Sequence, residues 1–168
     1  MPKKTKPAKV AAGIWKIDSR LFVANRFGAS ENPETLQHYL GITGVVNLAG
    51  AEYDDLFVDQ GIAYCNLRVL DRVDAVLPIT EALAFIQAHH MKQGDGAVLV
   101  HCRGAHSRSL AICTAWLMHA HNMPLATDLG HVKGGRALQH INAGFLKQLE
   151  AFDDTQPQTK DKDESFLQ

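Results

Sequence analysis

The sequence has few cysteines and no long apolar run. Its three cysteines, Cys65, Cys102 and Cys113, cannot form a complete disulfide framework. We therefore expect free thiols and a reducing compartment, with a cytoplasmic location favoured and a nuclear one as the alternative. The first 15 residues, MPKKTKPAKVAAGIW, carry lysines but no apolar core, so we expect neither a signal peptide nor a membrane anchor.

A strong charge of either sign is also missing. The formal net charge is −1 over 168 residues, so no polyanion-binding surface is expected over the whole molecule and no nucleic-acid partner is predicted. Any anion site must therefore be local. An apolar fraction of 46% in a chain of this length fits one domain with a buried core.

The two ends of the chain differ in composition from the middle. Residues 1–12 form a basic, proline-containing arm, and residues 153–168 form a polar tail. Both compositions are typical of flexible segments, although the arm could also act in nuclear import. We expect a single domain over residues 13–152.

Strand-like and helix-like segments alternate within this domain. Asn32, Pro33 and Gly41 have the residue types of a helix N-cap, first position and stop. The alternation predicts an α/β fold with a central mixed sheet of about four to five strands flanked by helices. Strands are expected at 20–25, 43–48, 63–69 and 97–100, and helices at 32–41, 77–94, 110–120, 124–133 and 142–152.

One thiol lies in a polar loop between an apolar strand and a helix, in VLVHCRGAHSRSLAIC (98–113). The unpaired amide groups of such a loop and helix start can bind a dianion. Gly104 allows a tight turn, and Arg108 can contact two phosphate oxygens. Cys102 lies at the floor of this site beside arginine and a helix N-terminus, which favour a thiolate that attacks phosphorus.

Residues 101–109, HCRGAHSRS, resemble the signature of the cysteine-dependent protein tyrosine phosphatases: histidine, cysteine, five residues, arginine, then serine or threonine. The segments IWKIDSRLFVAN, LGITGVVNL and INAGFLKQLEAF resemble the small, atypical dual specificity branch. This resemblance implies a phosphatase-type sandwich whose phosphate-binding loop joins a central strand to a helix.

The resemblance also implies roles for the loop residues. Cys102 would be the nucleophile and Arg108 the phosphate ligand, while Ser109 would stabilise the thiolate when it leaves. His101 would orient the loop backbone. The residues expected to bind the phosphate are Arg103, Gly104, Ala105, His106, Ser107 and Arg108.

The general acid must come from another segment, because the leaving oxygen needs a proton. The segment LRVLDRVDAV resembles the acid loop of the family and offers Asp71 and Asp74. We favour Asp71, because it comes just after the predicted strand and because the spacing in the family favours it, and we expect it to act later as the base. This chemistry needs no metal or cofactor, and the histidine pairs are not spaced as metal ligands.

The loop departs from the family pattern at one place. Gly104 followed by Ala105 inverts the usual order of alanine and glycine. If the third position after the cysteine requires positive φ, Ala105 carries a penalty of about 1 kcal/mol, or the loop closes differently. His106 and Arg103 either add positive charge to the pocket rim or face solvent.

Four further residues have two interpretations each. Arg136 either contacts substrate or is a surface arginine, and Asn142 either braces the loop or caps a helix. Cys65 and Cys113 are expected to be inert, with a disulfide to oxidised Cys102 as the alternative.

These residues predict a protein phosphatase that hydrolyses phosphotyrosine and phosphoserine or phosphothreonine through a cysteinyl-phosphate intermediate. The expected partner is a phosphorylated protein substrate; the oligomeric state is not indicated. One alternative is a phosphatase of a phosphoinositide, glycan or RNA. The other is a phospho-binding pseudophosphatase.

Overall fold

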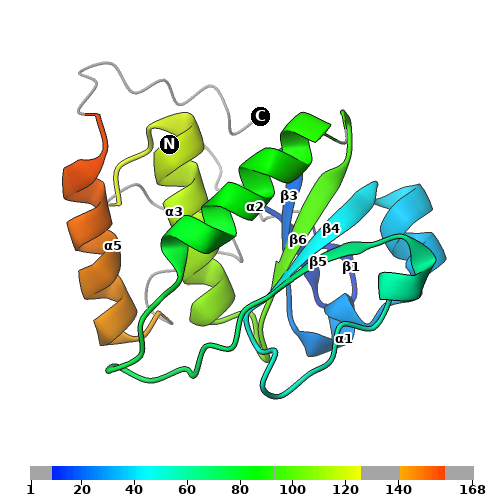
Figure 1. Cartoon of the computed structure of the whole chain (residues 1–168), viewed down its shortest axis with the longest axis horizontal. Helices are drawn as coiled ribbons and strands as arrows, with labels where there is room; N and C mark the ends of the chain where they lie inside the picture. Colours follow the sequence, from blue (N-terminus) through cyan, green and yellow to red (C-terminus); the bar gives the residue numbers. More distant parts are fainter. Residues whose placement is uncertain (1–8, 93, 126–140, 158–168) are drawn as a thin grey trace, which may run out of the picture.

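A mixed β-sheet forms the centre of the computed structural model, which describes residues 9–92, 94–125 and 141–157 (Figure 1). The strand order is β1-β2-β3-β6-β4-β5, with parallel pairing from β3 to β5 and an antiparallel hairpin of β1 and β2 at one edge. The predicted fold class is confirmed. The strands are β1 (Lys9–Ala11), β2 (Ile14–Lys16), β3 (Leu21–Ala24), β4 (Ile42–Asn47), β5 (Ala63–Asn66) and β6 (Ala97–His101).

The sheet has six strands within the described residues, because the N-terminal hairpin adds to the four central ones. Lys9–Ala11 lies inside the segment that we assigned to the basic arm, yet it pairs with β2. Residues 1–8 of that arm and residues 158–168 of the predicted tail lie outside the described residues. The last helix extends to Thr155, three residues into the predicted tail.

Helices cover both faces of the sheet (Figure 1). One face carries α2 (Ile79–Lys92), α3 (Arg108–His121) and α5 (Ala143–Thr155), and the other carries α1 (Arg26–Ala29) and the π-helix η1 (Thr35–Tyr39). The short 3-10 helix η2 (Val58–Gln60) precedes β5.

Strand β6 is central and buried on both sides, as its continuous apolar sequence predicts. Val98 and Val100 pack into the core under α2, α3 and α5, whereas Ala97 and Leu99 pack into the core under α1 and η1. This alternation follows from the two-residue period of a strand. The loop that follows β6 is therefore fixed between two packed layers.

The residues predicted to begin and end the segment at 32–41 have the expected local geometry. Asn32 Oδ1 accepts a hydrogen bond from Thr35 N at 2.8 Å, and Gly41 ends this segment at φ +67°. The predicted helix at 32–41 is nonetheless shorter and π-helical. The predicted helix at 124–133 lies outside the described residues from residue 126 on, and so does Arg136.

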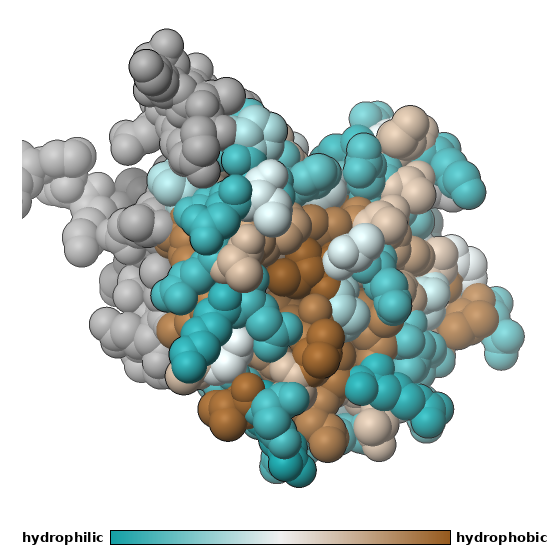
Figure 2. Space-filling model, turned by 60° about the vertical axis from the view of Figure 1, so that its left-hand side comes forward, coloured by the Kyte–Doolittle hydropathy of each residue, from teal (hydrophilic) through white to brown (hydrophobic). Residues whose placement is uncertain are grey.

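Figure 2 turns the side of α5 toward the viewer and shows apolar residues gathered in the middle of this face, with hydrophilic residues around them. The partly buried residues Ile79, Phe85, Leu146 and Phe152 pack against the core beneath α2 and α5.

In the part of the chain that the structure describes, every helix is too short or too polar to cross a lipid bilayer.

Candidate active site

A pocket of about 440 Å³ opens where β6 ends and α3 begins. This position is the carboxyl edge of the parallel strands, where ligands of α/β folds commonly bind. The loop between the two elements is held from the side of α1, because Arg26 N–H donates to Arg103 O at 3.0 Å. The pocket is lined by Glu52, Asp71, Cys102, Arg103, Gly104, His106, Ser107 and Arg108.

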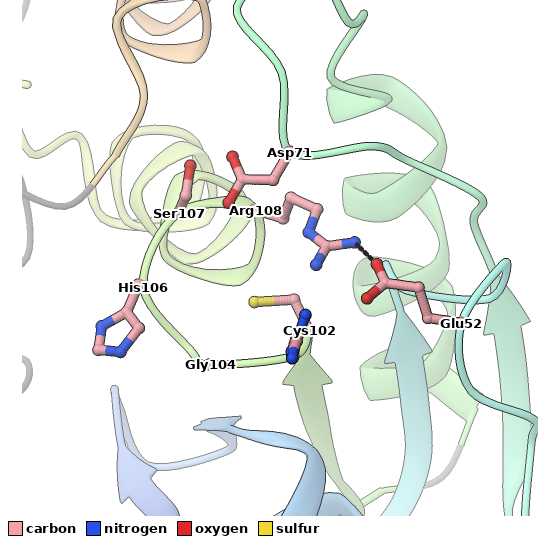
Figure 3. Close-up of a pocket in the computed structure, with 8 residues that line it drawn as sticks. Glu52, Asp71, Cys102, Gly104, His106, Ser107 and Arg108 are labelled. Atoms are coloured by element: carbon pink, nitrogen blue, oxygen red, sulfur yellow. Dashed lines mark hydrogen bonds and ion pairs between the residues drawn. The ribbon is translucent and has the colours of Figure 1, made fainter.

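The sulfur of Cys102 lies at the floor of this pocket, and the loop curves around it (Figure 3). Cys102 is 2% exposed, and its Sγ lies 3.2 Å from Ser109 Oγ. The Ser109 hydroxyl, in the first turn of α3, can therefore donate a hydrogen bond to a thiolate at this position.

The guanidinium of Arg108 is buried against the pocket and only partly bonded. Its Nη1 donates to Glu52 Oε1 at 2.6 Å and to Val69 O at 2.9 Å. Its buried Nε has no hydrogen-bond partner among the described residues. A buried donor without a partner costs about 1–3 kcal/mol, and a bound anion would remove this cost.

Glu52 was not predicted from the sequence. It lies 56 residues from Arg108 in the chain, in the loop after β4, and its side chain is 33% exposed. No motif marks this glutamate. One feature could have pointed to it: Glu52 follows the carboxyl end of β4, and β4 pairs with β6 in the sheet.

Asp71 faces the pocket from the segment between β5 and α2 (Figure 3). Its Oδ1 accepts a hydrogen bond from Asn142 Nδ2 at 2.7 Å. Asp74 instead pairs with Arg72, at 2.9 and 2.8 Å, and lines a different cavity. Of the two aspartates considered from the sequence, Asp71 lines the pocket of Cys102 and Asp74 does not.

Asn142 joins three parts of the site. Its backbone N–H donates to Ser107 Oγ at 3.0 Å, and its side chain reaches Asp71. Its Oδ1 also accepts from Phe145 N at 2.9 Å, which caps α5. The two interpretations of Asn142, loop brace and helix cap, therefore both describe its contacts.

Ala105 has φ +53° and is fully buried, so of the two alternatives that the sequence left open for this loop, the structure has the left-handed conformation at the third position. Gly104 itself does not have a positive φ. A Cβ at Gly104 would lie 2.6 Å from Cδ2 of His106, so glycine here gives space to that ring. The inverted order places the strained conformation on an alanine.

Burial shifts the pKa values of His101, Cys65 and Cys113. Burial lowers the pKa of His101 to about 4, although its hydrogen bond with the Cys102 backbone opposes this, so the ring is neutral near pH 7. Burial raises the pKa of Cys65 and, more strongly, that of Cys113, which makes both weak nucleophiles.

Within the described ranges no three His, Cys, Asp or Glu side chains are grouped as metal ligands.

Arg103 and His106 are exposed and line the pocket rim. In Figure 3 the ring of His106 points away from the Cys102 sulfur. Of the loop residues predicted to bind phosphate, Ala105 alone does not line the pocket.

Residues 21–155 match the family model of the dual specificity phosphatase catalytic domain. Dual specificity protein phosphatase 1 of Arabidopsis thaliana is 36% identical over 139 residues, which cover 80% of this chain and 66% of that protein, just under two thirds of its length. Dual specificity protein phosphatase 18 of Rattus norvegicus is 32% identical over 148 residues, or 85% of this chain and 68% of that protein.

Two crystal structures have a similar fold. DUSP15 is 25% identical with a TM-score of 0.74, and the match covers 86% of this chain and 90% of that one. Human DUSP28 is 26% identical with a TM-score of 0.72, covering 89% and 97%. The chain belongs to the dual specificity phosphatase family, within the superfamily of cysteine-dependent protein tyrosine phosphatases.

Proposed function

We propose that this chain is a protein phosphatase that hydrolyses phosphotyrosine and phosphoserine or phosphothreonine through a cysteinyl-phosphate intermediate. One observation carries the proposal: the Cys102 sulfur lies at the floor of a pocket where the buried Nε of Arg108 has no partner among the described residues. A phosphate dianion supplies that partner and presents its phosphorus to the sulfur.

In the first step the Cys102 thiolate attacks phosphorus, an S–P bond forms and the P–O bond to the leaving group breaks. Asp71 gives its proton to the leaving oxygen. In the second step Asp71 takes a proton from water, the water oxygen attacks phosphorus, and the S–P bond breaks. Ser109, 3.2 Å from the sulfur, stabilises the thiolate that is released.

The arginine contributes a fixed hydrogen-bonding edge. Because Glu52 and Val69 O occupy Nη1, the Nε and Nη2 edge of Arg108 is left for two phosphate oxygens. Such bidentate contacts are strong and set the orientation of the phosphate. Stabilisation of transition-state charge by donors fixed in advance is a main source of catalysis.

The first experiment compares hydrolysis of an aryl phosphate by the wild type and by Cys102→Ser. We expect phosphate release by the wild type and none by the variant. Near-zero rates for both proteins, with phosphopeptide binding preserved, would instead identify a phospho-binding pseudophosphatase.

The second experiment tests the acid. Asp71→Ala should lower turnover about 100-fold or more for substrates with poor leaving groups and far less for good ones, since only poor leaving groups need the proton. Asp74→Ala is the matched control and should leave the leaving-group dependence unchanged. An equal loss for all leaving groups would remove Asp71 from the role of acid.

The substrate class is tested by parallel assays on phosphopeptides and on a panel of phosphoinositides, phosphorylated glycans and RNA 5′ phosphates. A higher kcat/KM on phosphopeptides supports the proposal, and the reverse order contradicts it. Asp71→Ala protein incubated with cell lysate should retain phosphorylated proteins, whose identity then names the substrate.

A further inference from the structure

Cationic and aromatic residues lie beside the phosphate loop, where the backbone of Arg26 bonds that of Arg103. We call this group the Arg26 rim and define it as Arg26, Phe27, Tyr53 and Arg103. Arg26 and Phe27 lie on α1, Tyr53 follows Glu52 in the chain, and Arg103 lines the pocket. Apart from Arg103, which the sequence predicts to bind the phosphate, the rim residues have no part in the proposed mechanism.

The backbone of the rim is fixed against the phosphate loop. Arg26 N–H donates to Arg103 O at 3.0 Å. On the other side of Arg26, Asn25 Oδ1 accepts from Gly28 N at 2.9 Å and Asn25 N–H donates to Gly13 O at 3.0 Å. The start of α1 therefore has a set position beside the pocket.

The guanidinium of Arg26 lies near two aromatic rings, those of Phe27 and Tyr53. The guanidinium carbon lies 4.6 Å from the centroid of the Phe27 ring and 6.0 Å from that of Tyr53. Its Nη1 donates to Tyr53 Oη at 3.2 Å. Aromatic contacts of this kind restrict an arginine without neutralising it, which reduces the entropy lost when it binds an anion.

The rim has positive charge that the rest of the described chain does not neutralise. Among the residues that the structure describes, no carboxylate forms an ion pair with Arg26 or Arg103. Of the three carboxylates next to Tyr53 in the chain, Glu52 bonds Arg108, Asp55 accepts from the amides of Asn47 and Asn66, and Asp54 is exposed. Phe27 is 66% exposed beside this charge.

We infer that the Arg26 rim is a specificity subsite that binds a second anionic group of a phosphorylated peptide, close in sequence to the phosphoresidue in the pocket. The group is an acidic side chain or a second phosphate. Arg26 and Arg103 supply the charge, and Phe27 gives an apolar surface for the peptide chain. The inference rests on the proposed protein phosphatase function.

The test uses phosphotyrosine peptides that differ at one flanking position, which is alanine, aspartate, lysine or phosphoserine. The measured quantity is the ratio of kcat/KM for an anionic peptide to that for the alanine peptide. Exposed ion pairs of up to about 1 kcal/mol each predict a ratio of about 5 to 10 at the best position. A larger ratio for phosphoserine than for aspartate would identify the group as a second phosphate, and the reverse as a carboxylate.

Charge reversal at Arg26 gives the sharper readout. Arg26→Ala should bring the ratio toward one, and Arg26→Glu should shift the preference to the lysine peptide. Lys92→Ala is the matched control, because it removes an exposed cation at the end of α2, away from the carboxyl edge of the sheet, and should keep the ratio. A wild-type ratio near one, or an anionic preference that survives in Arg26→Glu, would overturn the inference.

Two measurements separate this inference from the proposed function. Hydrolysis of a small aryl phosphate by the wild type tests the function alone. Affinities of the Cys102→Ser protein for the same peptides, measured by calorimetry, test the rim without turnover. Anionic peptides should bind about 5- to 10-fold more tightly than the alanine peptide, and equal affinities would contradict the subsite whatever the catalytic result.

Discussion

Ala105 combines a left-handed backbone with complete burial, and the two facts have opposite effects on its replacement by glycine. Ala105→Gly removes a left-handed cost of about 1–2 kcal/mol. It also loses a buried methyl worth about 0.8 kcal/mol and adds about 0.5–1 kcal/mol of unfolded-state entropy. We therefore expect the free energy of unfolding in urea to change by less than about 1 kcal/mol.

Ala105→Val provides the contrast at the same position. A β-branched side chain tolerates positive φ poorly, and two more methyls would have to fit into a fully buried site. We expect the free energy of unfolding to fall by more than about 2 kcal/mol. Equal stability of the Gly and Val variants would show that neither strain nor packing limits this position.

Glu52 should position Arg108 through its carboxylate. A hydrogen bond to a charged group contributes about 1.5–3 kcal/mol, so Glu52→Ala is expected to lower kcat/KM on an aryl phosphate by about 10-fold or more. Glu52→Gln keeps an acceptor oxygen and should retain most of the activity. Glu150→Ala, an exposed glutamate of α5, is the control. Higher activity of Glu52→Ala would show that the carboxylate competes with the substrate.

For single residues, the sequence predicts the members of a site well when they share a short segment. It predicts them poorly when they come together only through the fold. Cys102, Arg108 and Ser109 lie within eight consecutive positions and meet because one loop and one helix turn carry them. Asp71 could be placed through the family resemblance. Glu52 could not, because its contact depends on the pairing of β4 with β6.

Among the elements, α5 holds the segment that carries Asp71. Gln148 Oε1 accepts from Leu77 N at 2.8 Å, and its Nε2 donates to Ala75 O at 2.9 Å. Near the start of α5, Gly144 packs so closely on the carbonyl of Val73 that a Cβ there would overlap it. The position of Asp71, the proposed acid, therefore depends on a helix that begins more than 70 residues later in the chain.

Gly144→Ala should displace this segment, because a backbone carbonyl cannot give way as the end of a side chain can. We expect lower turnover with poor leaving groups, measured as phosphate release, and a smaller effect with good ones. Ala151→Gly, exposed in the same helix, is the control and should cost about 1 kcal/mol of stability without changing turnover. Unchanged turnover in Gly144→Ala would mean that the segment adjusts without moving Asp71.

The long elements could be predicted and the short ones could not, for a physical reason. α2, α3 and α5 each span more than three turns, so their apolar period and caps are visible in the sequence. α1 has four residues and β1 three, too few to show a period. α1 is fixed by a contact that is distant in sequence, Arg26 N with Arg103 O, and β1 by its pairing with the equally short β2.

For the whole molecule, buried histidines make stability depend on pH. The pKa of His101 is lowered by burial to about 4, while an unfolded histidine titrates near 6.5. Between these values the unfolded state binds more protons, so stability is fully present above pH 6.5 and is lost as the pH falls toward 4. Burial lowers the pKa of His89 and His90 too, with the same sign.

Asp18 contributes in a different range. Burial raises its pKa, but hydrogen bonds from His121, Arg20 and Trp116 outweigh this, and the net pKa is below the usual 3.8. Its contribution to stability is therefore present above pH 3.8 and is lost only as the pH falls through the lower, folded value. Between pH 6.5 and 4 the histidines govern the change instead.

His101→Asn isolates the largest of these contributions. The shift of His101 corresponds to about 3 kcal/mol over this range. The free energy of unfolding, measured in urea from pH 7 to pH 4, should therefore fall less steeply in the variant than in the wild type by about that amount. His119→Asn removes an exposed histidine of α3 and should keep the wild-type slope. If His101→Asn followed the wild-type curve, the buried ring would not be neutral in the folded state, and its hydrogen bond with the Cys102 backbone would have to hold an imidazolium at the base of the phosphate loop.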